Sequence, residues 1–510
     1  MIDFKSLQLN PLVSYKTLKP NSITNPINLT QKEIQIFDLF KEIIKEKNLD
    51  NIELRVVGGW VRDHLLNVPC NDLDITIKGM DTEKFAELLN EKLYQDNKDK
   101  YHISSSTLKR ANGFQIKLTK TIIFDNMVDL VELKENAFQD ALRRDFTFNA
   151  LFYNILENKV EDLLKEGIND LKNGFIRSSS TINQEINYDS YHVLRLFRFA
   201  NKYQYVIDDK YLSDIQKNKE IYQNDLLTKI SKEIIRKEMY LIFSGPNPSF
   251  AIYSLYKLDL LKQVLHLDKK YRNNKKNYFS DNNLLNCVNI FIVGKKIFDK
   301  YKPLFVGENY DDNYKCSLYS LLLTIHMKNF TDKSGNSLSK ILLSKTLKLE
   351  SRIPLKVINF FDDFNNFFEK NEYKRLNVGL LLRKILFRNI SLIIFISTAN
   401  EYVMKIYSNK VLDKIDENMI ENIFQKYYEF YKFLKKEKME NVDEMKPVID
   451  GKRIKKEFPG ITLNSIGKLV DAVINKQIEV DYNLSEEEGM KIIKEKIKEI
   501  NIDYNNKKDE

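Results

Sequence analysis

The sequence contains little cysteine, proline and glycine and no long apolar run. Its 510 residues include 3 cysteines, 10 prolines and 15 glycines. Cys70, Cys287 and Cys316 lie too far apart for a metal-binding spacing, and so few cysteines indicate a reducing compartment rather than a disulfide framework. Apolar runs such as 390–397 are too short to span a membrane. We therefore expect no membrane-spanning segment and many long helices, because few residues interrupt them.

The composition predicts several folded units and is compatible with a polyanionic partner. Hydrophobic residues make up 43% of the chain and charged residues 30%, and the net charge is +9. A chain of this length exceeds what one hydrophobic core normally holds, so more than one compact unit is expected. The basic excess suits binding to nucleic acid, although many proteins without that function share it.

The pattern of apolar residues divides the chain into a mixed α/β region and a helical region. Within the mixed region, extended stretches are predicted at 103–118 and 121–133. After about residue 185 the spacing of apolar residues becomes helical. The clearest helical segments are 191–203, 231–243, 248–261 and 284–301.

Two short motifs in the mixed region indicate a phosphate-binding loop and a metal site. Val57-Gly58-Gly59-Trp60-Val61-Arg62-Asp63 predicts a strand, a glycine turn and a short helix. Glycines let backbone N–H groups approach a phosphate, and Arg62, one turn into the helix, is placed to join them. In Asn71-Asp72-Leu73-Asp74 the two aspartates share one face of a strand. Two carboxylates beside a phosphate cradle suit a pair of Mg²⁺ ions in nucleotidyl transfer.

Each motif alone has an ordinary structural explanation. A Gly-Gly pair occurs in many turns, and an Asp-x-Asp pair is often a solvated strand edge. The ordered combination resembles the opening motif of the nucleotidyltransferase superfamily, in the version shared by class II tRNA nucleotidyltransferases (CCA-adding enzymes) and bacterial-type poly(A) polymerases. The resemblance implies that Asp72 and Asp74 hold metal and that Gly58, Gly59 and Arg62 bind the nucleotide.

A third carboxylate is predicted on a neighbouring strand. Asp129 lies in Val128-Asp129-Leu130-Val131, after a predicted turn at 125–126. An aspartate at a strand edge is the plain alternative, but its neighbours favour metal ligation and help in deprotonating the attacking 3′-hydroxyl. We therefore predict Asp72, Asp74 and Asp129 as the catalytic and metal-binding carboxylates of a two-Mg²⁺ site.

A second motif follows at 141–151. Arg143-Arg144-Asp145-Phe146-Thr147-Phe148-Asn149-Ala150-Leu151 closely resembles the R-R-D-x-T-x-N-A-L motif of the same family. The resemblance implies that Arg144 contacts the triphosphate, that Asp145 contacts the ribose hydroxyls, and that Asn149 braces this segment against the head. A helix with a charged first turn explains neither the double arginine nor the occurrence of both motifs in one chain.

The segment 188–199 resembles the family motif E-D-x-x-R-x-x-R-x-x-R-F. Its apolar residues on one helical arc are expected in the core, while His192, Arg195 and Arg198 share the opposite arc by their spacing of three. In the family, the aspartate and the first arginine bond to the Watson–Crick edge of the incoming C or A. Asp189, His192, Arg195 and Arg198 are therefore predicted to bind the nucleotide.

Three departures from the family pattern concern the nucleotides that are added. His192 stands in place of the first arginine, and Tyr188 in place of the glutamate; an imidazole cannot reproduce the fork of a guanidinium. The connection 133–140 is short, and in the family a loop between the third carboxylate strand and the double arginine is needed to switch from CTP to ATP. In 231–238, which resembles the family's S-x-E-R-I motif, Ile234 replaces the arginine.

The resemblance covers nearly the whole chain and predicts its organisation. Its fold class is an α/β nucleotidyltransferase head, with a mixed or antiparallel sheet, followed by an all-α neck, body and tail. The tail resembles the C-terminal region of eukaryotic CCA-adding enzymes at Lys446-Pro447-Val448-Ile449-Asp450-Gly451-Lys452-Arg453. The predicted parts are an N-terminal extension (1–29), the head (30–177), the neck (178–247), the body (248–445) and a tRNA-binding tail (446–510).

Basic residues around the start of the tail are candidates for holding the tRNA backbone. Lysine runs are more often solvated faces, so this prediction needs the rest of the resemblance. If these residues bind RNA, the affinity should fall steeply with salt. The candidates are Lys435, Lys436, Lys438, Lys452, Arg453, Lys455 and Lys456.

The sequence thus predicts a tRNA nucleotidyltransferase that adds CCA to tRNA 3′ ends from CTP and ATP, with Mg²⁺ and without a nucleic-acid template. The short connection makes a CC-adding enzyme the first alternative. The eukaryotic-like tail argues against a poly(A) polymerase, and the retained carboxylates argue against a catalytically idle RNA-binding protein. The first 20 residues show no clear signal-peptide core, so we expect a cytoplasmic protein, with the nucleus and the mitochondrion as further compartments.

Overall fold

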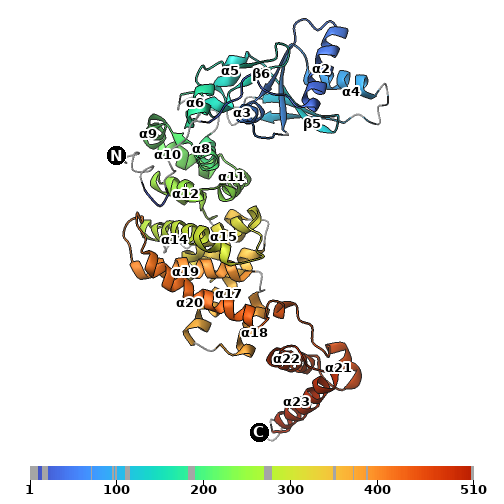
Figure 1. Ribbon diagram of the computed structural model, residues 1–510, viewed down its shortest axis with the longest axis vertical. Helices are drawn as coiled ribbons and strands as arrows, with labels where there is room; N and C mark the ends of the chain where they lie inside the picture. The colour runs from blue at the N-terminus through green and yellow to red at the C-terminus, as the bar shows by residue number, and fades with distance from the viewer. Residues whose placement is uncertain are drawn as a thin grey trace. The chain divides into compact units, whose positions relative to one another are not determined.

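The computed structural model divides into two compact units, Met1–His266 and Leu267–Glu510. The first unit contains an α/β head and the helices that follow it, and the second is built from helices (Figure 1). Helices at 248–264, assigned from the sequence to the body, thus fall in the first unit. The structure describes residues 10–13, 21–70, 72–94, 97, 100, 102–109, 115–181, 190–268, 271, 278–348, 352–370, 373–385 and 389–506.

A seven-stranded sheet forms the centre of the head, in the order β3-β4-β5-β2-β1-β6-β7. Neighbouring strands are antiparallel, except β2 and β5, which are parallel. The prediction of an α/β head with a mixed sheet is therefore confirmed. The strands are β1 (Glu53–Val57), β2 (Leu73–Lys78), β3 (Ile103–Lys109), β4 (Gln115–Ile123), β5 (Asn126–Glu132), β6 (Phe152–Asn154) and β7 (Lys159–Glu161).

Strands β4 and β5 have one covered face and one open face. Ile123 and Val128 are fully buried, on the face where helix α4 (Thr82–Tyr94) packs. Lys120 and Met127 are exposed on the other face. Because side chains alternate along a strand, the same two strands contribute to the core and leave a face free for a site.

The predicted extended stretches are only partly correct. Strand β4 runs through Thr119 and Lys120, where the sequence suggested a break. The chain turns at Phe124 and Asp125, one position before the predicted turn at 125–126, and their φ angles are 47° and 62°. A tight hairpin turn requires positive φ at both central residues, and Phe124 gives no sequence signal for that conformation.

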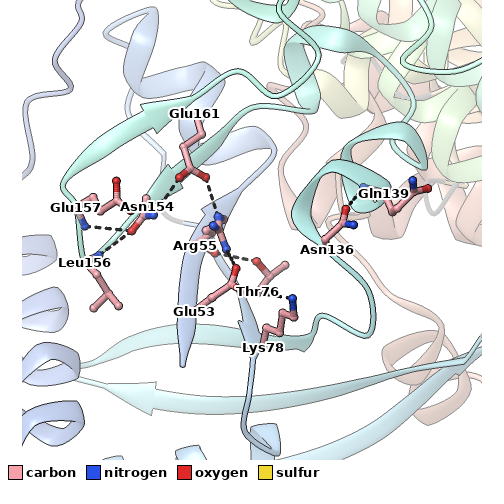
Figure 2. A network of polar contacts seen from close by, with 10 residues as sticks. All are labelled: Glu53, Arg55, Thr76, Lys78, Asn136, Gln139, Asn154, Leu156, Glu157 and Glu161. Atoms are coloured by element: carbon pink, nitrogen blue, oxygen red, sulfur yellow. Dashed lines mark hydrogen bonds and ion pairs between the residues drawn. The ribbon is translucent and has the colours of Figure 1, made fainter. Parts of the chain in front are cut away.

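A polar network ties the far side of the sheet together (Figure 2). The Nε of Arg55 on β1 donates to Glu161 on β7 at 2.7 Å, and its Nη1 donates to Glu53 at 2.5 Å. Asn154 on β6 donates to the other oxygen of Glu161 at 3.0 Å. These bonds connect β1, β6 and β7 by side chains as well as by the backbone.

After the head, the chain continues into helix α8 (His192–Tyr203). It packs against α11 and α12, and its predicted apolar arc is fully buried at Val193, Leu194, Leu196, Phe197 and Ala200. A short parallel pair, β8 (Phe175–Ile176) and β9 (Val206–Ile207), connects the end of the head to this region. The other helices are α2 (Gln31–Glu46), α3 (Gly59–Leu65), α5 (Ala137–Leu142), α6 (Gly167–Asn173), α9 (Asp209–Lys217), α10 (Lys219–Thr228), α11 (Lys232–Ser244), α12 (Pro248–Lys257) and α13 (Leu261–Val264).

The second unit is a bundle in which α14, α19 and α20 pack side by side (Figure 1). The apolar run near 390 belongs to α19, which is buried along most of its length. Among the described residues, no helix is long and apolar enough to cross a membrane. The α-helices of the second unit are α14 (Asp281–Tyr301), α15 (Asp312–Thr324), α16 (Leu338–Ile341), α17 (Ile353–Lys370), α18 (Arg375–Ile385), α19 (Ile390–Ile406), α20 (Glu417–Lys436), α21 (Gly451–Glu457), α22 (Leu463–Glu479) and α23 (Glu486–Asn506).

The segment predicted as a tail has its own small core. Asp450 is the N-cap of α21 and accepts a bond from the Arg453 amide at 2.8 Å, so the Asp-Gly-Lys-Arg motif begins this helix. A Cβ at Gly451 would lie 3.1 Å from Ile466, which keeps α21 close to α22. The core residues are Ile449, Ile454, Ile466, Leu469, Val473 and Ile493.

A buried glutamate fixes the start of α2 against the glycine-turn helix α3. Glu33 completes a capping box with Thr30, and it accepts bonds from Trp60 Nε1 at 2.6 Å and His64 Nε2 at 2.9 Å. Burial raises the pKa of Glu33, but the bonds from His64 and Thr30 outweigh it and lower that pKa to about 2. The ionised form of Glu33 therefore stabilises the head.

We predict that Glu33→Gln lowers the free energy of unfolding of the first unit by about 2 kcal/mol at neutral pH. Because the pKa of Glu33 is depressed in the folded state, this contribution is present above pH 4.5 and is lost as the pH falls towards 2. Urea titrations followed by the fluorescence of Trp60, the one tryptophan in the chain, measure it. A difference between the proteins that does not shrink between pH 5 and pH 3 would contradict the assignment.

Candidate active site

Three of the predicted site residues, Gly58, Asp74 and Asp129, lie at one end of the sheet. Strand β1 runs towards this end and leads into Gly58, while β2 and β5 both start there. Antiparallel pairing of β1 with β2 and parallel pairing of β2 with β5 make these three chain ends neighbours. Gly58, Asp74 and Asp129, separated by more than 70 positions in total, are thereby brought together.

Two of the predicted carboxylates lie directly opposite each other on the open face. Asp74 of β2 and Asp129 of β5 are register partners. Asp74 is accessible to solvent, yet the surrounding protein partly desolvates it, which raises its pKa; Asp129 and Asp72 add negative charge in the same direction. Arg144 and Lys120 oppose this rise by their positive charge. The site is therefore a cluster of like charges with two cations beside it.

Lys120 is a site neighbour that the sequence analysis missed. It is the register partner of Asp129 on β4, and its Nζ donates to Asp129 Oδ2 at 2.6 Å. Lys120, Asp129 and Asp74 thus form one row across three adjacent strands. The available signal was the alternation of β4, which places Lys120 on the face opposite the buried Thr119 and Thr121.

The three carboxylates offer the chemistry that Mg²⁺ prefers, namely oxygen ligands with net negative charge. A divalent cation would offset the repulsion among these carboxylates, which adds to the effect of burial on the pKa of Asp74. In the conformation described, no group of three or more His, Cys, Asp or Glu among the described residues is arranged around a metal position, and Asp129 bonds to Lys120 instead. Metal ligation by Asp72, Asp74 and Asp129 therefore stays a prediction.

Position 58 requires glycine because of its backbone conformation and the close approach of Arg144. Its φ of 72° and ψ of −123° form a conformation that residues with a Cβ rarely adopt. A Cβ there would lie 3.1 Å from Nη1 of Arg144. The Gly58 amide donates to the Leu151 carbonyl at 3.3 Å and so supports the turn in this conformation. The sequence analysis expected this amide to face a phosphate.

Arg144 lies beside the glycine turn and acts on Asp74 through its charge. Its Nη2 donates to Asp140 at 2.8 Å, and its guanidinium carbon lies 5.3 Å from the centroid of the Phe152 ring. Its Nη1 is the atom beside Gly58, and its charge acts on Asp74. A half-buried cation is thus held between the glycine turn and the carboxylate row.

Arg62 is placed differently from the prediction. It is only 6% exposed, its Nε and Nη2 bond to the two carboxylate oxygens of Asp63, and its Nη1 donates to Asn149 at 2.6 Å. Its guanidinium also lies 5.4 Å and 5.1 Å from the ring centroids of Phe199 and Tyr203 on α8. In this conformation Arg62 joins α3 to α8, because aromatic residues distant in sequence cover it.

Asp145 is the centre of a buried polar cluster between the head and α8. It is 5% exposed; one oxygen accepts from Asn149 at 3.0 Å and the other from the Nε of Arg195 at 2.7 Å. Burial raises the pKa of Asp145, but Arg195, His192 and Asn149 hold it well below its usual range. The predicted brace by Asn149 agrees with its bonds to Arg62 and Asp145, whereas Asp145 faces protein donors here.

The predicted nucleotide-reading arc of α8 is largely covered. His192 is 7% exposed and lies close enough to Asp145 to act on its charge. Arg198 forms an ion pair with the buried Glu238 of α11 at 2.8 Å. Asp189 and Tyr188 lie outside the described residues, as does Asn71. The structure therefore brings His192 and Arg195 together around Asp145, whereas Arg198, on the same helix, is paired with Glu238 of the neighbouring α11.

The two other departures from the family pattern are visible in the structure. The connection between β5 and α5 consists of 133–136 alone, because the helix already begins at Ala137. Ile234 lies in the first turn of α11 and is 38% exposed, and Ser231 caps that helix by accepting from the Ile234 amide at 3.3 Å.

Comparison with known proteins places this geometry in a class. Residues 54–177 match the family described as the poly A polymerase head domain. The chain is 29% identical to a mitochondrial CCA tRNA nucleotidyltransferase of Candida glabrata, over 88% of this chain and 92% of that protein. Its fold is similar to that of the Thermotoga maritima CCA-adding enzyme complexed with tRNA, with a TM-score of 0.59, 18% identity, and coverage of 92% and 96%. A CCA-adding enzyme in complex with CTP gives a TM-score of 0.58 at 17% identity, with coverage of 92% and 94%.

The head is thus a nucleotidyltransferase domain, with a carboxylate row and a glycine turn at one end of a mixed sheet. The head matches the poly A polymerase head-domain family, and most of the chain is similar to CCA tRNA nucleotidyltransferases.

We predict that Gly58→Ala destabilises the first unit by about 2 kcal/mol, because alanine must adopt a strained conformation and approach Arg144. The matched control is Gly59→Ala. Gly59 begins α3, and a Cβ there would lie 3.5 Å from Arg62, an ordinary contact. Urea denaturation compares the two variants; equal stabilities would contradict the role assigned to the Gly58 turn.

Proposed function

We propose that this protein is a tRNA nucleotidyltransferase that adds CCA to tRNA 3′ ends from CTP and ATP, without a nucleic-acid template. The observation that carries the proposal is the juxtaposition of the Asp74–Asp129 pair with the Gly58 turn and Arg144 in a class II head. Relatives that match nearly the whole chain are named for this activity.

The carboxylate row supplies the position for metal-assisted transfer. Asp72, Asp74 and Asp129 would hold Mg²⁺, which supplies charge stabilisation at the α-phosphate and lowers the pKa of the attacking hydroxyl. Arg144 draws the triphosphate towards the row, and the Gly58 turn keeps the backbone close to it. The tRNA 3′-oxygen bonds to the α-phosphorus, the bond to the bridging oxygen breaks, and pyrophosphate leaves.

The cluster around Asp145 is proposed to select the incoming base. Arg195 and His192 place side-chain hydrogen-bond donors at the boundary between the head and α8, close in sequence to Asp189. Arg62, Asp145 and Arg198 form the frame that sets their positions. Contact of Arg62 with phosphate and of Asp145 with ribose, implied by the family motifs, would require these side chains to exchange their present partners.

A CC-adding enzyme is the alternative that a specific observation favours. The four-residue connection 133–136 leaves little chain for a loop between β5 and α5. The names of the relatives favour complete CCA addition. Only the identity of the nucleotide added to a CC end separates the two activities.

Basic residues of the second unit are proposed to contact the tRNA backbone. Lys452 and Lys455 are exposed on α21, and Lys436 is exposed at the end of α20. Arg453 is paired with Glu486 at 3.0 Å, so it contributes less free charge than the sequence suggested. The compartment is proposed to include the mitochondrion, for which the relatives are named, beside the cytoplasm and nucleus.

Transcripts of one tRNA that end before CCA, after C and after CC test the proposed activity. With a single labelled nucleotide in each reaction, we expect CMP on the first two transcripts and AMP on the third. CMP addition without AMP addition on the CC end would support the CC-adding enzyme. Long adenosine tails would support a poly(A) polymerase, and binding of tRNA without incorporation would support an idle RNA-binding protein.

Asp74→Asn should reduce incorporation at least ~100-fold, because the row loses a negative ligand at the position where charge develops. Affinity for tRNA, measured by filter binding, should change less than about twofold. Asp125→Asn, at the tip of the β4–β5 hairpin, removes one carboxylate of the same strand pair and should leave incorporation unchanged. Retained turnover in Asp74→Asn would remove the basis for a metal role of this residue.

A further inference from the structure

The open face of the β4–β5 hairpin carries an apolar surface directly beside the carboxylate row. Ile122 and Met127 are register partners, two positions from the partners Lys120 and Asp129. Because residues two apart on a strand share a face, both apolar side chains lie on the face that bears the carboxylates. Met127 is 60% exposed and Ile122 is half-buried.

Ile122 and Met127 do not belong to the core on the covered face of the hairpin. The core on that side is formed by the alternate residues, including Thr121, Ile123 and Val128, all fully buried. Met127 is among the most exposed large apolar side chains of the described head. Its exposure leaves an apolar surface beside the site that is suitable for an apolar ligand face.

The in-line geometry of phosphoryl transfer indicates which substrate lies next to this surface. Arg144 and the Gly58 turn approach the row from the side of β1, and the sheet order places β5 and β4 on the opposite side of β2. In phosphoryl transfer the attacking and leaving oxygens lie roughly in line across the phosphorus. If pyrophosphate leaves on the β1 side, the attacking 3′-hydroxyl must enter from the side of β5 and β4.

We propose that Ile122 and Met127 form an acceptor platform, which holds the 3′-terminal base of the RNA acceptor. The platform lies about 7 Å along the strands from the carboxylate row, which is two residues of extended chain. The base of a nucleotide whose 3′-oxygen lies at Asp129 can cover that distance. The exposed Lys120, which lies in the row two residues from Ile122, supplies a positive charge for the RNA backbone, as in other surfaces that combine stacking with cations.

An apolar platform also suits the successive RNA 3′ ends that the enzyme extends. The terminal base changes each time a nucleotide is added, so the acceptor subsite must accept different bases. A thioether and a branched alkyl group contact any base face without reading its hydrogen-bonding edge. The inference rests on the proposed function, because it assigns a subsite to the RNA that is extended.

The test uses CMP addition to a tRNA transcript ending after the first C, and to the same transcript with an abasic 3′-terminal nucleotide. For the wild type we expect kcat/KM for RNA to fall about fivefold when the base is removed. Met127→Ala should lose about fivefold on the normal transcript and should then respond less than about twofold to base removal. The KM for CTP should stay unchanged in the variant.

Leu118→Ala is the matched control, since Leu118 lies on the same face, two residues from Lys120 in the other direction. It should retain the wild-type response to base removal, and melting temperatures confirm that both variants are folded. Equal responses of Met127→Ala and wild type to base removal would overturn the platform while leaving the proposed function intact. If the wild type extends no RNA at all, the proposed function fails, and this inference fails with it.

Discussion

Strand pairing between β2 and β5 forces two carboxylates to face each other on an open sheet surface, and much of the head can be understood as a response to that constraint. Burial raises the pKa of Asp74, and repulsion from Asp129 raises it further. Two protein cations lie nearby, Lys120 on β4 and Arg144 beside the glycine turn. A site with this charge arrangement is suited to take up divalent cations and a polyphosphate.

A second buried carboxylate, Asp145, organises the boundary between the head and α8. Its bonds to Asn149 and Arg195, together with the bonds of Arg62 to Asn149 and Asp63, join the glycine-turn helix to the helix that follows the head. Removing one member of such a buried network leaves a charge without its partner, at a cost of several kcal/mol. The residues proposed to select the base are thereby held in register with the residues proposed to hold its phosphates.

Much of this arrangement was predictable from local patterns. Alternation placed Asp74 on the open face of β2, the glycine pair predicted the turn, and helical periodicity identified the buried arc of α8 correctly. The roles of the arginines were less predictable, because a guanidinium can face a ligand or a protein carboxylate equally well. Arg62 was expected at a phosphate and is covered by Phe199 and Tyr203, whose proximity depends on how α3 and α8 pack.

The sequence by itself determined the residue types of the site, the mixed head followed by helices, and the family. Only the tertiary structure decided the register that aligns Lys120, Asp129 and Asp74 in one row, and the apolar pair Ile122 and Met127 beside it. Local sequence fixes which face a side chain occupies. The neighbour across the sheet depends on where the β4–β5 hairpin turns, and on hydrogen bonding between β2 and β5, strands about 50 residues apart.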